Sequence, residues 1–273
     1  MRQGRYILLI FAQFIALMAW SQVQQLSFER IAAREGLSDL NILCIMQDSR
    51  GFIWIGTENG LNRYDGHQCR VFLNDPSDPE SISNNYVKSI VEDSQGNLWI
   101  ATHGGGLDKF DRKKNLFSHY LHQSNNTGTL SDNAVNKIIA DHNGKFWIAT
   151  SNGLNLFDPA TSHFRPFFHN ESDPKTISDN NVSTAFADSR GNLWFGTING
   201  GLNRMVAKDS SFIRYKSDEK DPGAISGDNI SSIYEDQSNR LWIGTRGDGV
   251  NLFNYSNSKF EHFENTKLSL IHI

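Results

Sequence analysis

The stretch DSQGNLWIATHGGGLD, residues 93–108, decides the fold because variants of it recur along the whole chain. The other copies are DSRGFIWIGTENGLN from Asp48, DHNGKFWIATSNGLN from Asp141, DSRGNLWFGTINGGLN from Asp188 and DQSNRLWIGTRGDGVN from Asp236. Their tryptophans stand at positions 54, 99, 147, 194 and 242, so the intervals are 45, 48, 47 and 48 residues. A fixed period of roughly this length is typical of propellers and solenoids.

One copy of the repeat reads as four short strands. In the second copy we predict strands over residues 87–92, 97–102, 107–111 and 116–120. Asp93 and Gly96 occupy the first and fourth positions of a type I turn, and His103-Gly104-Gly105 turns the chain again. A helical repeat would need a 3.6-residue period and few glycines. The sequence therefore predicts an all-β fold, a β-propeller of four-stranded blades with five repeats present.

The segments between the copies also repeat. Connections rich in Asp, Pro and Ser cover residues 74–83, 122–131, 169–178 and 217–226, as expected for hydrophilic crossings between blades. Each predicted fourth strand after the first carries an aromatic pair three residues apart: Phe117/Tyr120, Phe164/Phe167, Phe212/Tyr215 and Phe260/Phe263. A similar pair, Phe28/Ile31, precedes the first repeat and is interpreted as the outer strand of an unfinished blade.

That unmatched outer strand predicts an incomplete propeller over residues 22–265. Residues 266–273 fall outside the repeat pattern, and we interpret them as an irregular end of the kind that read-through into a sequencing adapter would produce. Before the propeller, Arg2 and Arg5 precede an apolar run over residues 6–20. A positive start and a short apolar core predict a signal peptide over residues 1–21, with an uncleaved anchor as the alternative.

Composition limits the functional classes. The chain has 30 acidic and 26 basic residues and a net charge of −4, which gives no basic footprint for nucleic acid. Its two cysteines, Cys44 and Cys69, exclude a scaffold of several disulfides. They fall on the first and fourth strands of one predicted blade, roughly 14 Å apart at the usual strand spacing. A disulfide needs Cα atoms within about 7 Å, so we predict two free thiols.

The phrase D-x-x-G-x-[LIF]-W-[IF]-[GA]-T, followed by two or three residues and G-[LV], resembles the regulator-propeller repeat. The resemblance covers residues 26–264, and only the fifth copy departs, with Asn239 at the turn glycine. That repeat fills the periplasmic sensor region of hybrid two-component system proteins in Bacteroidetes. The resemblance implies a periplasmic input region that senses a glycan, an oligosaccharide or another small ligand. It also implies that the partners are the rest of a sensor histidine kinase and a second copy of the full-length protein.

Two other functional classes stay open. One is a secreted propeller that binds protein or polysaccharide with no kinase attached, and the other is a propeller hydrolase or lyase. The Asp-x-x-Gly phrase is also similar to the Asp-box of sialidase propellers, but the Arg cluster, Tyr nucleophile and acid of that chemistry cannot be assembled here. The turn aspartates are interpreted as caps and the tryptophans as packing between blades. We expect no catalytic residues, no metal and no cofactor, since neither a calcium loop nor H-E-x-x-H occurs.

The candidate binding residues lie in the loops between second and third strands. In a propeller these loops emerge at the same end as the segments that enter the next blade, opposite the Asp-x-x-Gly turns. The turns hardly vary between copies, whereas these loops differ in every copy, as expected for recognition on a rigid scaffold. Arg246 is the first candidate because a guanidinium binds a carboxylate through two bonds. Glu58, His103 and Asp248 follow, with ordinary solvated loop residues as the alternative.

The predicted signal peptide can be tested directly. We expect export with cleavage between Ser21 and Gln22, because a small residue at the end of the apolar run suits the processing enzyme. Amino-terminal sequencing of the exported protein should begin at Gln22. A sequence that begins at Met1 would support the uncleaved anchor instead.

Overall fold

The computed structural model describes residues 28, 30–141, 143–206 and 208–263. The predicted signal peptide, residues 1–21, and the irregular end, residues 266–273, lie outside these residues. Contacts divide the chain into residues 1–31 and residues 32–273, and the fold described below belongs to the second unit. None of the helices in the described residues is long and apolar enough to cross a membrane.

The described part of the second unit consists of five antiparallel sheets of four strands each, preceded by one short 3-10 helix (Ala33–Glu35). Blade 1 contains β1 (Ile42–Gln47), β2 (Ile53–Thr57), β3 (Gly60–Tyr64) and β4 (Cys69–Phe72). Blade 2 contains β5 (Val87–Glu92), β6 (Leu98–Thr102), β7 (Gly106–Asp111) and β8 (Leu116–Tyr120). Blade 3 contains β9 (Val135–Ala140), β10 (Phe146–Thr150), β11 (Gly153–Asp158) and β12 (His163–Phe167).

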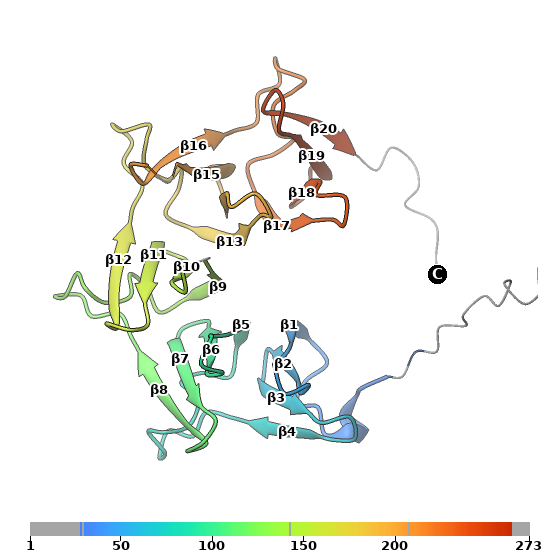
Figure 1. Ribbon diagram of the computed structural model, residues 1–273, viewed down its shortest axis with the longest axis vertical. Coiled ribbons are helices and arrows are strands. Elements are labelled where there is room, and N and C mark those ends of the chain that lie inside the picture. The colour runs from blue at the N-terminus through green and yellow to red at the C-terminus, as the bar shows by residue number, and fades with distance from the viewer. Residues whose placement is uncertain (1–27, 29, 142, 207, 264–273) are drawn as a thin grey trace, which may run out of the picture. The chain divides into compact units, whose positions relative to one another are not determined.

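The remaining two sheets repeat the pattern. Blade 4 contains β13 (Val182–Ala187), β14 (Leu193–Thr197), β15 (Leu202–Val206) and β16 (Ser211–Tyr215). Blade 5 contains β17 (Ile230–Glu235), β18 (Leu241–Thr245), β19 (Val250–Asn254) and β20 (Lys259–Phe263). Figure 1 shows the first strand of each blade nearest a common axis and the fourth strand outermost. The predicted all-β propeller of four-stranded blades is therefore confirmed.

Successive blades touch along the axis through their inner strands. The contacts run from β1 to β5, from β5 to β9, from β9 to β13 and from β13 to β17. Within the described residues, blades 1 and 5 stand apart in Figure 1, so the series of blades forms an open arc.

The repeated aspartate holds each first turn together and attaches it to the tryptophan. In blade 1, Oδ1 of Asp48 accepts the backbone N–H groups of Arg50 and Phe52, and Oδ2 accepts the indole N–H of Trp54 at 2.7 Å. The same three bonds recur in blades 2, 4 and 5. The turn residue Asn239 has φ of 57°, so asparagine takes the left-handed conformation that glycine has elsewhere.

These observations confirm the predicted capping role of the aspartates and add an indole bond that the sequence did not reveal. Blade 3 is the exception. Asp141 accepts the backbone N–H groups of Asn143 and Lys145, whereas the buried indole nitrogen of Trp147 has no hydrogen-bond partner among the described residues.

The hydrophobic core lies between blades, where the tryptophan of one blade meets a phenylalanine of the next. The ring centroids are 5.6 Å apart for Trp54 and Phe110, and 5.1 Å apart for Trp99 and Phe157. Trp194 meets the equivalent Phe253 of blade 5, whereas Trp147 meets Phe195, which lies on the second strand of blade 4 rather than the third. The predicted packing role of these four tryptophans is therefore confirmed.

At the end of each blade opposite the Asp-x-x-Gly turns, a second polar cluster holds the segment through which the chain enters that blade. In blade 1, Asn62 accepts from the backbone N–H of Ser38 at 2.9 Å and donates to the Ser38 hydroxyl at 2.8 Å. The Ser38 hydroxyl also lies 3.2 Å from that of Thr57, which donates to the carbonyl of Gly60. Equivalent bonds centre on Asn155, Asn203 and Asn251. This cluster fixes the loop end of each blade.

Two sequence expectations are settled by the positions of the residues concerned. The outer strand predicted at Phe28/Ile31 is wrong, because the described residues there form no strand and Phe28 is 90% exposed. Cys44 lies on β1 and Cys69 on β4, at opposite edges of blade 1, and both are free thiols as predicted.

Replacing a tryptophan should cost stability according to whether another blade covers it. Trp194 is fully buried against blade 5, whereas Trp242 is half-buried and packs on Phe263 of its own blade. We expect Trp194→Ala to lower the free energy of unfolding by about 3–5 kcal/mol, as for other large-to-small core changes. Trp242→Ala should cost clearly less in the same urea titration. Equal losses would contradict packing between blades as the main role of the tryptophan.

Candidate functional site

The loops between second and third strands gather at one end of the blades, as predicted. Each loop bonds to the segment that enters its own blade, as in the bond from the backbone N–H of Glu58 to the carbonyl of Asn41. The loops of blades 1 to 4 also reach the next blade; in blade 1 the N–H of Gly60 donates to the carbonyl of Asn85 at 2.7 Å. Within blade 2, the N–H of His103 donates to the carbonyl of Tyr86, as that of Glu58 does to Asn41 in blade 1. We call this the loop end of the propeller.

Glu58 and His103 approach each other through Tyr86. The Tyr86 hydroxyl lies 3.3 Å from Oε1 of Glu58, and its ring centroid lies 5.6 Å from that of His103. Oε2 of Glu58 also accepts from the side-chain amide of Asn41. Burial raises the pKa of Tyr86, and the Glu58 carboxylate raises it further, so the phenol stays neutral. Two candidates from different blades therefore share one aromatic residue.

Tyr86 was missed by the sequence analysis, although a signal was present. The residue just before the innermost strand is Asn41, Ala134, Asn181 or Asn229 in the other blades. Only blade 2 places an aromatic side chain there, at the loop end. A departure of this kind is what recognition on a repeated frame requires.

Arg246 and Asp248 form a separate group on blade 5. Both side chains are exposed, and the backbone N–H of Arg246 donates to the carbonyl of Asn229 at 2.8 Å. The Ser226 hydroxyl donates to the carbonyl of Asp248 at 2.6 Å, which fixes the loop. The contacts of the described residues do not join this pair to Glu58 or His103, so the four candidates fall into two groups.

The opposite end, where the Asp-x-x-Gly turns lie, holds neighbouring blades together. The guanidinium of Arg112 in blade 2 lies 3.3 Å from Asp48 and 3.1 Å from Glu92. Ser49 donates its backbone N–H and its hydroxyl to the same Glu92 carboxylate, at 2.7 and 2.6 Å. These ion pairs tie blade 1 to blade 2, although the buried guanidinium nitrogens of Arg112 form no hydrogen bond among the described residues.

Blades 4 and 5 are tied in a related way. The Tyr255 hydroxyl donates to Oδ2 of Asp188 at 2.8 Å, and the guanidinium of Arg190 lies 3.7 Å from the centroid of the Tyr255 ring. Ser189 donates its N–H and hydroxyl to Glu235. Burial raises the pKa of Tyr255, and its bond to Asp188 adds to that rise, so this phenol also stays neutral.

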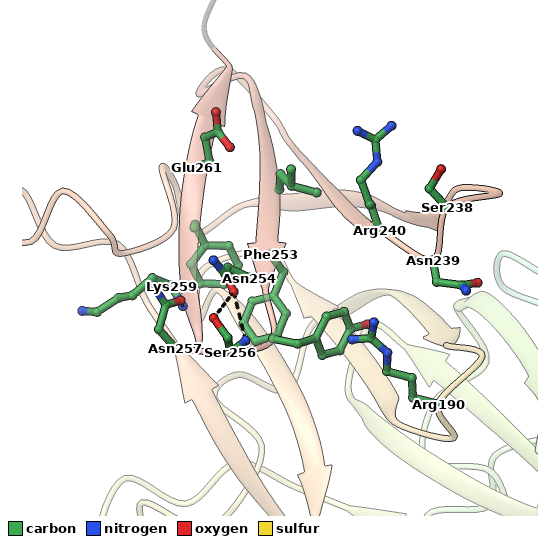
Figure 2. Close-up of a pocket in the computed structure, with 13 residues that line it drawn as sticks. Arg190, Ser238, Asn239, Arg240, Phe253, Asn254, Ser256, Asn257, Lys259 and Glu261 are labelled. Atoms are coloured by element: carbon green, nitrogen blue, oxygen red, sulfur yellow. Dashed lines mark hydrogen bonds between the residues drawn. The ribbon is translucent and has the colours of Figure 1, made fainter.

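A pocket of about 430 Å³ lies beside this second tie and is drawn in Figure 2. Its cationic side chains already have partners. Arg190 stacks on Tyr255, Arg240 pairs with Asp236 at 2.6 Å, and Lys259 pairs with Asp221. Because these cationic side chains already have partners within the protein, the pocket offers an anion little electrostatic attraction.

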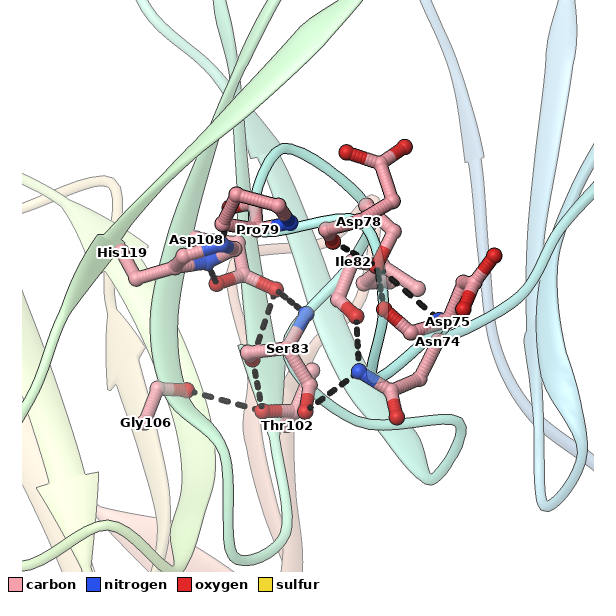
Figure 3. Close-up of polar contacts among 11 residues, drawn as sticks. Asn74, Asp75, Asp78, Pro79, Ile82, Ser83, Thr102, Gly106, Asp108 and His119 are labelled. Carbon is pink, nitrogen blue, oxygen red and sulfur yellow. Dashed lines mark hydrogen bonds and ion pairs between the residues drawn. The ribbon is translucent and has the colours of Figure 1, made fainter.

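Blade 2 departs from the others at its polar cluster, which Figure 3 shows in detail. Asp108 replaces the asparagine of the other blades and is fully buried. Its Oδ2 accepts the N–H and hydroxyl of Ser83 at 2.9 and 2.8 Å, and its Oδ1 lies 2.6 Å from Nδ1 of His119. Nε2 of His119 lies 2.9 Å from the carbonyl of Pro79. Both imidazole nitrogens therefore face acceptors, which favours the doubly protonated ring.

This cluster brings a serine, a histidine and an aspartate together without the order that nucleophilic catalysis requires. In a Ser-His-Asp triad the histidine lies between the other two and takes the serine proton. Here Asp108 lies between Ser83 and His119, and the serine donates to the carboxylate. The hydrogen bond to Asp108 raises the pKa of His119, and burial opposes that rise. The arrangement fixes the crossing loop rather than activating a hydroxyl.

A larger cavity of about 630 Å³ lies at the propeller axis between the innermost strands. All five blades contribute to its walls, and its charged lining residues are Lys88 and Lys137. In the part of the chain that the structure describes, no three His, Cys, Asp or Glu side chains gather as metal ligands.

Comparison with known protein families identifies the same repeat. The profile of the family described as two component regulator propeller matches residues 36–59, 81–104, 129–152, 176–199 and 224–247. Each match begins where the chain enters a blade and ends in the loop after the second strand. The five blades are two component regulator propeller repeats.

Among solved structures, this regulator propeller is similar to the extracellular domain assigned to a hybrid two component system of B. thetaiotaomicron. The two are 28% identical with a TM-score of 0.74, and the match covers 85% of this chain and 31% of that chain. The regulator propeller is also 35% identical over 80 residues to histidine kinase P4 of Formosa agariphila. That match covers 29% of this chain and 6% of the kinase. The chain thus spans less than a third of either relative.

Some structural neighbours are enzymes. A catalytically inactive virginiamycin B lyase from Staphylococcus aureus superimposes with a TM-score of 0.62 at 15% identity. The match covers 84% of this chain and 71% of the lyase. At this identity the likeness concerns the fold alone.

The Asp108–His119 pair should make stability depend on pH. Because its folded-state pKa is raised, His119 contributes stability in full below the unfolded-state pKa, about 6.5, and loses that contribution as pH rises through the folded value. Asp108→Asn, which restores the residue of the other blades, should remove this contribution. A hydrogen bond to a charged group contributes about 1.5–3 kcal/mol, which bounds the loss at low pH.

Urea titrations between pH 5.5 and 9 measure the difference in unfolding free energy between the wild type and Asp108→Asn. We expect this difference to be largest at low pH and to shrink as pH rises. His262→Asn is the matched control, since His262 lies on β20 beside Asn251 rather than an aspartate. A difference that is constant with pH would show that Asp108 does not raise the pKa of His119 in the folded protein.

Proposed function

We propose that this regulator propeller is the ligand-sensing input region of a hybrid two component sensor histidine kinase and faces the periplasm. The observation that carries the proposal is the similarity to an extracellular domain of a hybrid two component system over 85% of the chain. The local match to a histidine kinase agrees with it. The proposed ligand is an oligosaccharide or a glycan breakdown product.

The loop end is the proposed recognition surface. Sugar rings stack on aromatic faces and bond to carboxylates and imidazoles, and Tyr86, Glu58 and His103 supply these groups together. Arg246 and Asp248 supply a second polar group on blade 5. The turn end, by contrast, repeats almost unchanged and uses its charges to join blades.

Signalling in this proposal requires parts beyond the propeller. The input region passes its ligand-bound state to the rest of the sensor chain, and the full-length protein acts as a homodimer. A secreted propeller without a kinase is the alternative. Recognition is favoured over serine hydrolase activity because Asp108, rather than the histidine, lies between the other two side chains in the group of Ser83, Asp108 and His119.

The loop-end proposal predicts the effect of two substitutions in the full-length sensor. Arg246→Ala combined with His103→Ala should weaken binding of the activating oligosaccharide by about tenfold or more, the typical loss of charge-assisted hydrogen bonds. Calorimetry against a panel of neutral and acidic oligosaccharides gives the affinity, and autophosphorylation gives the signal. Arg50→Ala is the matched control, because Arg50 is also exposed but lies at the turn end.

Unchanged affinity in the double variant, together with a loss in Arg50→Ala, would place recognition at the turn end. Binding of an oligosaccharide without any kinase signal from the full-length gene product would favour the secreted propeller. Cleavage of a member of the panel would favour an enzyme.

A further inference from the structure

Every innermost strand of the propeller contains an irregularity at the same place. The pairing register with the second strand shifts at the second residue of β1, β5, β9, β13 and β17. A β-bulge leaves one residue out of the ladder and redirects its side chain. The five bulged residues are Leu43, Lys88, Asn136, Ser183 and Ser231, and all of them line the axial cavity. The bulges therefore aim one side chain per blade at the axis.

Two of these side chains act as ties between blades. The amide of Asn136 donates to the carbonyl of Val182 in blade 4 at 2.9 Å, and the hydroxyl of Ser183 donates to the carbonyl of Ile230 in blade 5 at 2.5 Å. In blade 2 the position holds Lys88, a cation, whose ammonium lies 5.8 Å from the centroid of the Tyr86 ring. A strongly hydrated charge serves poorly as such a tie, so this lysine calls for a different explanation.

Lys137, the residue after the bulge in blade 3, lines the same cavity. Both lysines also act on Cys44 of β1. Burial raises the pKa of that thiol to about 11, and the positive charges of Lys137 and Lys88 oppose the rise. Lys88 and Lys137 thus line the same cavity from neighbouring blades.

The positive charge in the cavity is not compensated. No aspartate or glutamate is among the described residues that line it, and no carboxylate oxygen in the described residues lies within 4.0 Å of either lysine ammonium. The other polar lining groups are hydroxyls and an amide, including Thr184 and Ser232. A concave site with one sign of charge attracts the opposite sign, and its low-dielectric walls strengthen the field.

We propose that the axial cavity binds an oxyanion, the carboxylate or sulfate group of a small ligand, between Lys88 and Lys137. The identification of the ligand as an acidic saccharide rests on the proposed function, which this inference makes more specific. Lys88 connects the two levels of the site, because the Tyr86 ring beside it also contacts Glu58 and His103. The acid group of the ligand lies in the cavity, and its sugar ring reaches the loop end.

The test uses the whole chain with three probes: glucuronate as the acidic sugar, glucose as its neutral counterpart, and inorganic sulfate as the free oxyanion. Calorimetry should detect glucuronate and sulfate but not glucose. Lys88→Met and Lys137→Met keep the aliphatic stem without the charge and should weaken binding of both anions about tenfold or more, as for a lost charge-assisted bond. Lys88→Arg, which keeps the positive charge, should retain the binding of both anions. Lys114→Met is the matched control, because Lys114 is exposed in the turn between β7 and β8.

The calorimetry with these three probes can support or overturn the proposal. Equal binding of glucose and glucuronate, no binding of either anion, or unchanged affinity in both methionine variants would overturn the proposal. Lysine-dependent binding of sulfate without glucuronate would support the oxyanion site and overturn the acidic sugar. Thermal melting of each variant shows whether a loss reflects unfolding instead, and Lys88→Arg then separates charge from structure.

The inference and the proposed function can fail separately. A neutral oligosaccharide that activates the full-length sensor equally well in Lys88→Met would overturn the axial site and leave the sensor function standing. Lysine-dependent glucuronate binding that never alters autophosphorylation would support the axial site and contradict the sensor function.

Discussion

In four of the five blades, the carboxylate of the turn aspartate is the interaction that organises the other contacts of the blade. One oxygen caps the backbone of the turn, and the other orients the tryptophan indole, so a single side chain sets both the hairpin and the direction of the ring. The ring then determines where the next blade packs. The Trp242 bond lowers the pKa of Asp236 to about 2, which keeps this acceptor ionised across the ordinary pH range. Blade 3 shows that packing alone suffices for one tryptophan, since Trp147 is buried without the indole bond.

The spacing of residues along the chain was enough to predict most of the fold. The predicted strands over residues 87–92 and 116–120 coincide with β5 and β8, because alternating side chains and Asp-x-x-Gly turns are short-range properties that a sequence displays directly. The placement of Cys44 and Cys69 at opposite edges followed from strand order. The outer strand at Phe28/Ile31 failed for the complementary reason. Its pattern resembles a fourth strand, but pairing depends on a sheet edge elsewhere, which no local pattern supplies.

The candidate site was less accessible to such reasoning. Position within the repeat placed Glu58 and His103 in loops at a common end, but their convergence on Tyr86 depends on how two blades meet. The bulges depend on the pairing of two strands, so the sequence alone does not show that Lys88 faces the axis. Asp108 differs from the repeated asparagine only in having a carboxylate in place of the amide. The effect of this change, a pairing with His119, is visible only in the folded structure. In each case the informative residue departs from the repeat, and its meaning comes from another segment.

The contact between blades has a direction. Each blade offers its tryptophan face to the next and receives the tryptophan of the one before, and the two faces differ in composition. On blade 1 the receiving face leaves Ile45 65% exposed, whereas the equivalent Ile90 and Ile138 are covered by the preceding blade. A head-to-tail interface of this kind contains no stop signal of its own, unlike a self-complementary two-fold contact. The number of blades that such a repeat can join is therefore a question of the rotation between neighbours, and small changes of packing at the tryptophan alter the curvature of the whole series.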